Sequence, residues 1–506
     1  MKTLCTLLLS LTTCMSFSQT KKEIWYKNED YKKKAEYTSY PSIHCKVLGE
    51  QDLLDIHLFN LSYASGIKEF IDFKGKFHYA VGKSDIPNGT YPLDYLFWVL
   101  SIYEHEQKYR VAFIYYDAIT TIEKKTSGTA DYGNWLIKKD SLKKKGLASE
   151  SESDLVRIWY VSRWHLHKEQ TDYTFNQVKE LEAATRIRLG VDIIGSSRSP
   201  RSNIKTAKTL DTATLGSKNA PEELSKLLLP DTIVELMEKD QIDAVIVIPY
   251  GIIGQVPFHA LPLNSSEHFV DRYAYTIAPH LSNYIKVFQA NPNKVSKRNF
   301  LETVNPLIVG NPKFYSSQSI ILPDLPGAAR EASIIASLVN TTALIGEDAQ
   351  YDAILNKMKN SDFAYFATHA VPSFEDPANK SFLALTPSKN SKNGYLNIST
   401  IQKVLEKKTK LVVLSACQTG VGKSYKNGYC NIGRGFFIAG VDNAIMSLWN
   451  LDDENIVPFM TILMEELKKP QYFYPAENLR QAILRYKKIS ANPAYWSAMV
   501  NFGITY

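Results

Sequence analysis

From about residue 222 onward, short apolar runs alternate with amphipathic stretches along the chain. Continuous apolar runs are typical of strands that are buried on both faces of a parallel sheet. The stretches between them have apolar residues at helical spacing. This alternation predicts an α/β fold, with a mostly parallel sheet covered by helices on both faces. The predicted strands are 242–249, 275–280, 306–312, 362–369, 411–417 and 444–449, and the predicted helices are 230–239, 328–339, 348–359, 398–408, 432–440, 453–468 and 476–490.

The chain before residue 222 follows a different pattern and predicts a smaller, mixed N-terminal region. Short apolar runs favour strands or buried segments at 77–82, 95–103 and 109–116. A helical stretch is predicted over roughly 154–190, and a long surface loop or linker over 196–224, which is rich in Ser, Thr, Lys and Asn. The expected division is a signal peptide at 1–18, an N-terminal region of unknown role at 19–150, a helical segment and linker at 151–221, and the α/β domain at 222–506.

The first twenty residues predict export. Lys2 precedes an apolar stretch from Leu4 to about Met15, followed by small residues at Ser16 and Ser18. This is the layout of a secretory signal peptide with cleavage after Ser18, which places the protein in the periplasm or outside the cell. In an alternative interpretation Cys14 is the lipidated residue of a lipoprotein box, although Thr13 fits that box poorly. No other segment has the roughly 20 apolar residues of a spanning helix.

Composition narrows the function classes. Hydrophobic residues make up 44% of the 506 and charged residues 22%, which indicates packed cores rather than disorder. The net charge of +7 comes with lysine runs at 32–34 and 143–145. Such runs are typical of solvated faces, and without a recognition motif beside them no nucleic-acid partner is expected. The sequence lacks a GxSxG elbow, a P-loop, an HExxH motif and zinc-ligand spacing, so it implies no cofactor and no metal.

Two predicted strands end in reactive side chains, namely His369 and Cys417. With a single predicted helix between them, the strands are expected to be neighbours, and their tips to lie at the same edge of the sheet. A thiolate at Cys417 is a nucleophile, and His369 can take its proton and later protonate a leaving amine. The backbone N–H groups of Ala370 and Cys417 are candidates for an oxyanion hole. Either side chain alone would suggest a buried structural residue, which is how we interpret Cys430.

The segments YFATHA and LVVLSACQTG, which contain these two residues, resemble the CHAT domain family. That family has a caspase-like fold related to separase and the other clan CD cysteine peptidases. The resemblance extends over roughly 222–506 and implies a caspase-like αβα sandwich, with His369 as the catalytic histidine and Cys417 as the nucleophile. Many family members carry N-terminal helical repeats, which this sequence lacks. Further matching blocks lie at 245–263, 325–336, 433–456 and 493–503.

One departure from the family and one specificity feature follow from this resemblance. The family usually has Gly after this histidine, where Ala370 stands here. Alanine keeps the N–H group but is strained if the position requires a positive φ.

By resemblance to separase, Asp453 would line a pocket for Arg or Lys before the scissile bond. The alternative is that Asp453 caps the helix that starts there, and for Asp452, the other candidate for substrate binding, this cap is the preferred interpretation.

The sequence therefore predicts a secreted caspase-like cysteine endopeptidase that acts on a protein or peptide substrate and cleaves after Arg or Lys. The main alternative is a CHAT fold that serves as a protein-binding scaffold without activity. A third interpretation is a basic surface that binds a polyanion or the cell envelope. The segment SRSPR at 197–201 is a candidate site of self-cleavage.

Overall fold

The computed structural model comprises two compact units, which we describe separately. Unit 1 contains Met1–Lys68, Tyr79–Asn176 and Leu229–Val245, and unit 2 contains Glu69–His78, Gln177–Leu228 and Ile246–Tyr506. The predicted signal peptide and most of the segments 95–103 and 196–224 lie outside the described residues. The structure describes residues 67–71, 77–81, 100, 109–119, 155–191, 219–278, 300–314, 320, 322–405, 409–425, 428–469 and 474–503.

The described part of unit 1 is an antiparallel meander with one helix. Strand β3 (Val111–Ile119) pairs with β4 (Leu155–Val161), which pairs with β5 (Leu166–Thr174). The helix predicted over 154–190 is therefore wrong for its first half. The β4 sequence LVRIWYV is rich in β-branched and aromatic residues and buried along its whole length, which favours a strand. Within the predicted stretch, only α8 (Phe175–Arg188) is a helix.

Asp240, at the end of α10 (Asp231–Lys239), fixes the β4–β5 hairpin. Its carboxylate accepts hydrogen bonds from the hydroxyls of Tyr160, at 2.8 Å, and Ser162, at 2.5 Å. The Nδ1 atom of His165 lies 2.6 Å from the same carboxylate. Since Asp240 is buried, these bonds replace the water that it loses on folding.

The centre of unit 2 is a mostly parallel sheet, as predicted. In spatial order its strands in this unit are β7 (Ala274–Ile277), β18 (Met499–Gly503), β17 (Asn443–Ser447), β14 (Leu411–Ser415), β10 (Phe363–Ala367), β8 (Pro306–Pro312) and β9 (Leu344–Gly346). Neighbours in this order run parallel, except that β17 and β18 are antiparallel. The central strands β10, β14 and β17 are buried along their whole length and are mostly apolar, which explains why the sequence pattern predicted them.

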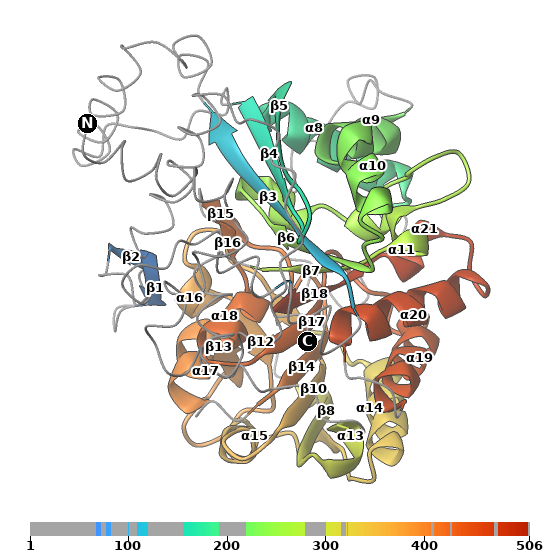
Figure 1. The fold of residues 1–506 in the computed structure, drawn as a ribbon. Coiled ribbons are helices and arrows are strands. Elements are labelled where there is room, and N and C mark those ends of the chain that lie inside the picture. The colour runs from blue at the N-terminus through green and yellow to red at the C-terminus, as the bar shows by residue number, and fades with distance from the viewer. Residues whose placement is uncertain are drawn as a thin grey trace, which may run out of the picture. The chain divides into compact units, whose positions relative to one another are not determined.

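Helices cover both faces of this sheet (Figure 1). On one face α14 (Pro326–Leu338) packs on β8 and β10, while α19 (Ile456–Lys468) joins it to α20 (Pro475–Lys487). On the other face α18 (Ile432–Ile438) packs on β17 and against α17 (Ile398–Val404). The predicted αβα sandwich is confirmed.

No helix among the described residues is long and apolar enough to cross a membrane. The remaining described elements are mostly short. These elements are β1 (Ile67–Ile71), β2 (Phe77–Val81), α9 (Ala220–Leu228), β6 (Ala244–Ile248), the short 3₁₀ helices η3 (Gly251–Gln255) and η4 (Phe258–Ala260), α11 (Phe269–Arg272), α13 (Phe300–Thr303), α15 (Tyr351–Met358), β11 (Ala370–Val371), α16 (Pro377–Lys380), β12 (Phe382–Ala384), β13 (Tyr395–Asn397), β15 (Lys423–Tyr425), β16 (Gly428–Cys430) and α21 (Pro493–Trp496).

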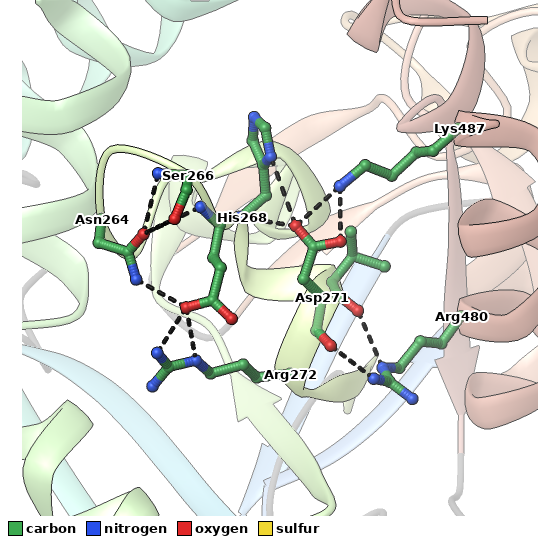
Figure 2. Close-up of polar contacts among 9 residues, drawn as sticks. Asn264, Ser266, His268, Asp271, Arg272, Arg480 and Lys487 are labelled. Carbon is green, nitrogen blue, oxygen red and sulfur yellow. Dashed lines mark hydrogen bonds and ion pairs between the residues drawn. The ribbon is translucent and has the colours of Figure 1, made fainter.

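Hydrogen bonds and an ion pair connect α20 with α11 (Figure 2). Lys487 donates to both carboxylate oxygens of Asp271, at 2.6 and 2.7 Å. Arg480 donates to the backbone carbonyls of Val270 and Asp271. Partial burial acts to raise the pKa of Asp271, but the hydrogen bonds from Lys487 and from the backbone of His268 outweigh it and lower that pKa.

Candidate active site

The two reactive side chains predicted from sequence lie beyond adjacent strand tips. β10 and β14 are parallel neighbours, with Ala367 opposite Ser415. His369 and Cys417 each follow a paired position by two residues, so the register brings both to the carboxyl edge of the sheet. The prediction that these strands are neighbours is confirmed. The connection between them contains more elements than the single predicted helix, namely β11, β12 and β13 and the helices α16 and α17.

His369 is fully buried and held from several directions. Its Nε2 atom lies 2.8 Å from the carbonyl oxygen of Pro323. A carbonyl can only accept, so Nε2 carries the hydrogen and Nδ1 is the nitrogen that can take up a proton. The ring of Phe314 packs edge-on against the imidazole, with 4.7 Å between centroids. The backbone carbonyl of His369 accepts from the N–H of Ala384 in β12.

The alanine that follows this histidine is unstrained. Ala370 begins β11 and pairs with Leu383 of β12 in an antiparallel ladder. Among the described residues, the non-glycine positions with positive φ are Gln241, Asn311, Asn340 and Gln418, and Ala370 is not one of them. The position therefore does not require glycine for its backbone conformation. The role of its N–H group in an oxyanion hole stays a prediction.

Cys417 is also fully buried and forms no disulfide. Its Sγ atom accepts the N–H of Leu451 at 3.4 Å, and its thiol donates to the carbonyl oxygen of the same residue at 3.9 Å. These two hydrogen bonds fix the position of the sulfur relative to the backbone of Leu451. The segment after β17 thus reaches the sulfur directly, which sequence reasoning did not find.

The residues Cys417–Gly422, which we name the cysteine turn, are paired with the end of β17. Gln418 has a φ of 52°, a left-handed conformation that costs energy for a residue with a side chain. Its N–H donates to the carbonyl of Trp449 at 3.3 Å, and the N–H of Gly420 donates to that of Ser447 at 2.7 Å. These bonds hold the strained turn in one conformation.

The two predicted pocket residues both bond to backbone N–H groups. Asp452 accepts the N–H groups of Glu454 and Asn455 in the turn that precedes α19, and the helix itself has no side-chain cap at its N-cap residue, Asn455. Asp453 is buried and accepts from the N–H of Gly327 at 2.6 Å and of Ala328 at 3.0 Å. It therefore caps α14, a different helix from the one considered from sequence.

Other sites have little support in the described residues. Cys430 is buried and forms no disulfide. Within the described ranges, no group of three or more His, Cys, Asp or Glu residues is arranged to hold a metal ion. Sequence reasoning missed Pro323, because a backbone carbonyl has no signature in residue identity.

Comparisons with known proteins identify the family of the segment that contains both residues. A family model described as the CHAT domain matches residues 218–504. Tetratricopeptide repeat protein 28 of Homo sapiens is 21% identical over 297 residues, covering 51% of this chain and 12% of that protein. The Mus musculus protein of the same name is 21% identical over 296 residues, covering 50% and 12%. The chain thus spans about an eighth of the length of these curated relatives.

Two solved structures are similar at lower identity. In the separase–securin complex of Saccharomyces cerevisiae the matched chain is 9% identical, with a TM-score of 0.45 and coverage of 81% of this chain and 31% of that one. The Arg specific cysteine proteinase gingipain R is 11% identical, with a TM-score of 0.38 and coverage of 57% and 67%. The family model spans more than half of the chain and includes both strand tips, and the chain therefore belongs to the CHAT domain family.

Proposed function

We propose that the protein is a cysteine endopeptidase in which Cys417 and His369 form the catalytic dyad. The observation that carries this proposal is the β10–β14 register, which places the two residues at equal distances beyond paired positions. The tautomer of His369 supports it, because the bond from Nε2 to Pro323 assigns proton uptake to Nδ1. The N–H of Leu451 at the sulfur supports it as well.

The reaction follows from these roles. The proton of the Cys417 thiol passes to His369, and the thiolate attacks the carbonyl carbon of the scissile peptide bond. The C–N bond then breaks as the imidazolium gives its proton to the leaving amine, which leaves a thioester on Cys417. Water, deprotonated by His369, hydrolyses the thioester and releases the acid product and the thiol.

We further propose that the enzyme cleaves after Arg or Lys, with Asp453 as the acid that recognises the basic side chain. Asp453 follows Leu451 by two residues, and Leu451 contacts the Cys417 sulfur. Both oxygens of its carboxylate already accept N–H groups of α14, so a guanidinium or ammonium group of the substrate would bind to their remaining lone pairs. Asp453→Asn should lower kcat/KM for Arg peptides relative to peptides with a neutral residue, by about tenfold or more. An unchanged ratio would refute this role.

Hydrolysis of fluorogenic peptides ending in Arg, Lys or Asp tests the proposed activity. The chain from Gln19 onward is compared with Cys417→Ala and His369→Ala. We expect cleavage after Arg or Lys that both substitutions abolish. Activity that survives Cys417→Ala would refute the dyad, and cleavage after Asp alone would refute the specificity.

A silent CHAT scaffold is the second candidate, and complete burial of both dyad residues favours it. In that case the fold would bind a protein partner through its surface and perform no chemistry. A thiol-reactive peptide probe separates the two candidates. The scaffold predicts that Cys417 reacts no faster than Cys430, which is equally buried.

A further inference from the structure

Arg186 lies in α8, outside the segment that the family model matches, yet it contacts the backbone next to the cysteine turn. From Gln177 onward α8 is part of unit 2. Nη1 of Arg186 donates to the carbonyl of Leu448 at 2.7 Å, and Nη2 donates to that of Gln255 at 2.9 Å. Nε donates to the buried carboxylate of Glu182, one turn earlier in the helix. The guanidinium is thus fixed at three points.

The contact with Leu448 holds the segment that reaches the cysteine sulfur. Carbonyls alternate in direction along extended backbone. Those of Ser447 and Trp449 accept from the cysteine turn, while that of Leu448 points the other way and accepts from Arg186. Three residues after Leu448, the N–H of Leu451 donates to Cys417 Sγ. The guanidinium also lies over the ring of Trp449, 5.5 Å from its centroid.

The contact with Gln255 reaches the other end of the same turn. The side-chain amide of Gln255 donates to the carbonyl of Gly422 at 3.0 Å. Arg186 therefore connects with the cysteine turn by two routes, through Leu448 toward Cys417 and through Gln255 toward Gly422. Only a planar guanidinium can donate to two carbonyls and a carboxylate in this fixed fork, because an ammonium group is a single point charge.

We propose that Arg186 is a positioning residue for Cys417, so that the functional peptidase unit begins at α8 rather than at the start of the family-matched segment. This inference rests on the proposed function. Arg186 does not touch the reacting atoms, and it acts by fixing where the cysteine turn and Leu451 lie. Small misplacements of a nucleophile cost large factors in rate, on the order of 100-fold for 1 Å.

The test compares Arg186→Gln and Arg186→Lys with Arg188→Gln, an exposed arginine on the same helix, as the matched control. Peptide hydrolysis gives kcat and KM separately, and thermal unfolding confirms that each variant is folded at the assay temperature. We expect Arg186→Gln to lower kcat about tenfold or more with little change in KM. Arg186→Lys should recover part of the loss, and Arg188→Gln should match the wild type.

A second readout does not depend on peptidase activity. Iodoacetamide alkylation of Cys417 is followed by mass spectrometry across a pH series. Losing the fixed Leu451 donor should shift the midpoint of the alkylation profile upward in Arg186→Gln by about half a pH unit or more. A wild type that hydrolyses no peptide would count against the proposed function, and this shift would still support the role of Arg186.

Three results would overturn the inference. The first is a kcat of Arg186→Gln equal to that of an active wild type. The second is an alkylation midpoint equal to that of the wild type. The third is that both Arg186 variants are unfolded at the assay temperature, which would make Arg186 a residue of stability alone.

Discussion

Replacing Asp453 by alanine tests how the segment after β17 is held against α14. Asp453 accepts two backbone N–H groups at the start of α14, at 2.6 and 3.0 Å, and no side chain at the N-cap position of that helix does so. A hydrogen bond to a charged group contributes about 1.5–3 kcal/mol, and a carboxylate at a helix N-terminus is further favoured by the helix dipole. We expect Asp453→Ala to lower the free energy of unfolding of unit 2 by about 3–5 kcal/mol.

Two variants sharpen this test. Asp453→Asn keeps one acceptor oxygen for the two backbone amides, so the free energy of unfolding of unit 2 should fall by about 2 kcal/mol. Asp452→Ala removes two hydrogen bonds to exposed backbone in the turn before α19 and should lower the free energy of unfolding by about 1 kcal/mol.

Hydrogen exchange is the assay, because it reports on unit 2 separately in a chain of two units. Amides of β10 and β14 give the free energy of unfolding, and those of Gly327 and Ala328 report directly on the cap. The reasoning is refuted if the Asp453→Ala and Asp452→Ala variants have equal exchange rates both in β10 and β14 and at Gly327 and Ala328.

Three further predictions concern stability. Burial lowers the pKa of His259 to about 3, below its unfolded value of 6.5, so the unfolded chain binds the proton more readily and stability falls as pH drops below 6.5. Between pH 7 and pH 4 the free energy of unfolding, measured with urea, should fall by about 3 kcal/mol more in the wild type than in His259→Asn. Equal losses would contradict this role of His259. Lys487→Met should cost about 1 kcal/mol at pH 7. That difference in the free energy of unfolding should be lost as pH falls through the lowered pKa of folded Asp271, below its ordinary value of 3.8, because a protonated Asp271 no longer pairs with Lys487, and a pH-independent cost would argue against the pair. Gly327→Ala should destabilise unit 2 by about 1–3 kcal/mol despite alanine's helix propensity, because its Cβ would lie 2.2 Å from the carbonyl oxygen of Asp453, and a stabilised variant would refute this contact.

Sequence pattern predicted the strands that carry the candidate site, because their local signals are strong. The runs ending at His369 and Cys417 are continuous and apolar because β10 and β14 are buried on both faces. The αβα architecture follows from the alternation of such runs with amphipathic helices. The same reasoning failed at 155–174, where a helical signal that belongs to α8 was extended over a hairpin.

Long-range contacts explain most of what sequence did not reveal. In sequence Asp453 stands where a cap of the following helix is expected, but the amide that it binds, that of Gly327, lies 126 residues earlier in the chain. Helical spacing predicts the helix that contains Arg186, but the bond from Arg186 to Leu448 spans 262 residues, and no local pattern indicates it. The orienting group of His369 is a backbone carbonyl, which any residue at position 323 would supply.

Covalent labelling by a peptide probe that carries an electrophilic ketone after Arg tests the dyad most directly. The protein contains its own control, because Cys430 is also buried and outside any disulfide. Mass spectrometry should find the probe on Cys417 and not on Cys430, and His369→Ala should abolish the labelling. Equal labelling of both cysteines, or labelling of Cys417 that persists in His369→Ala, would contradict the Cys417–His369 dyad.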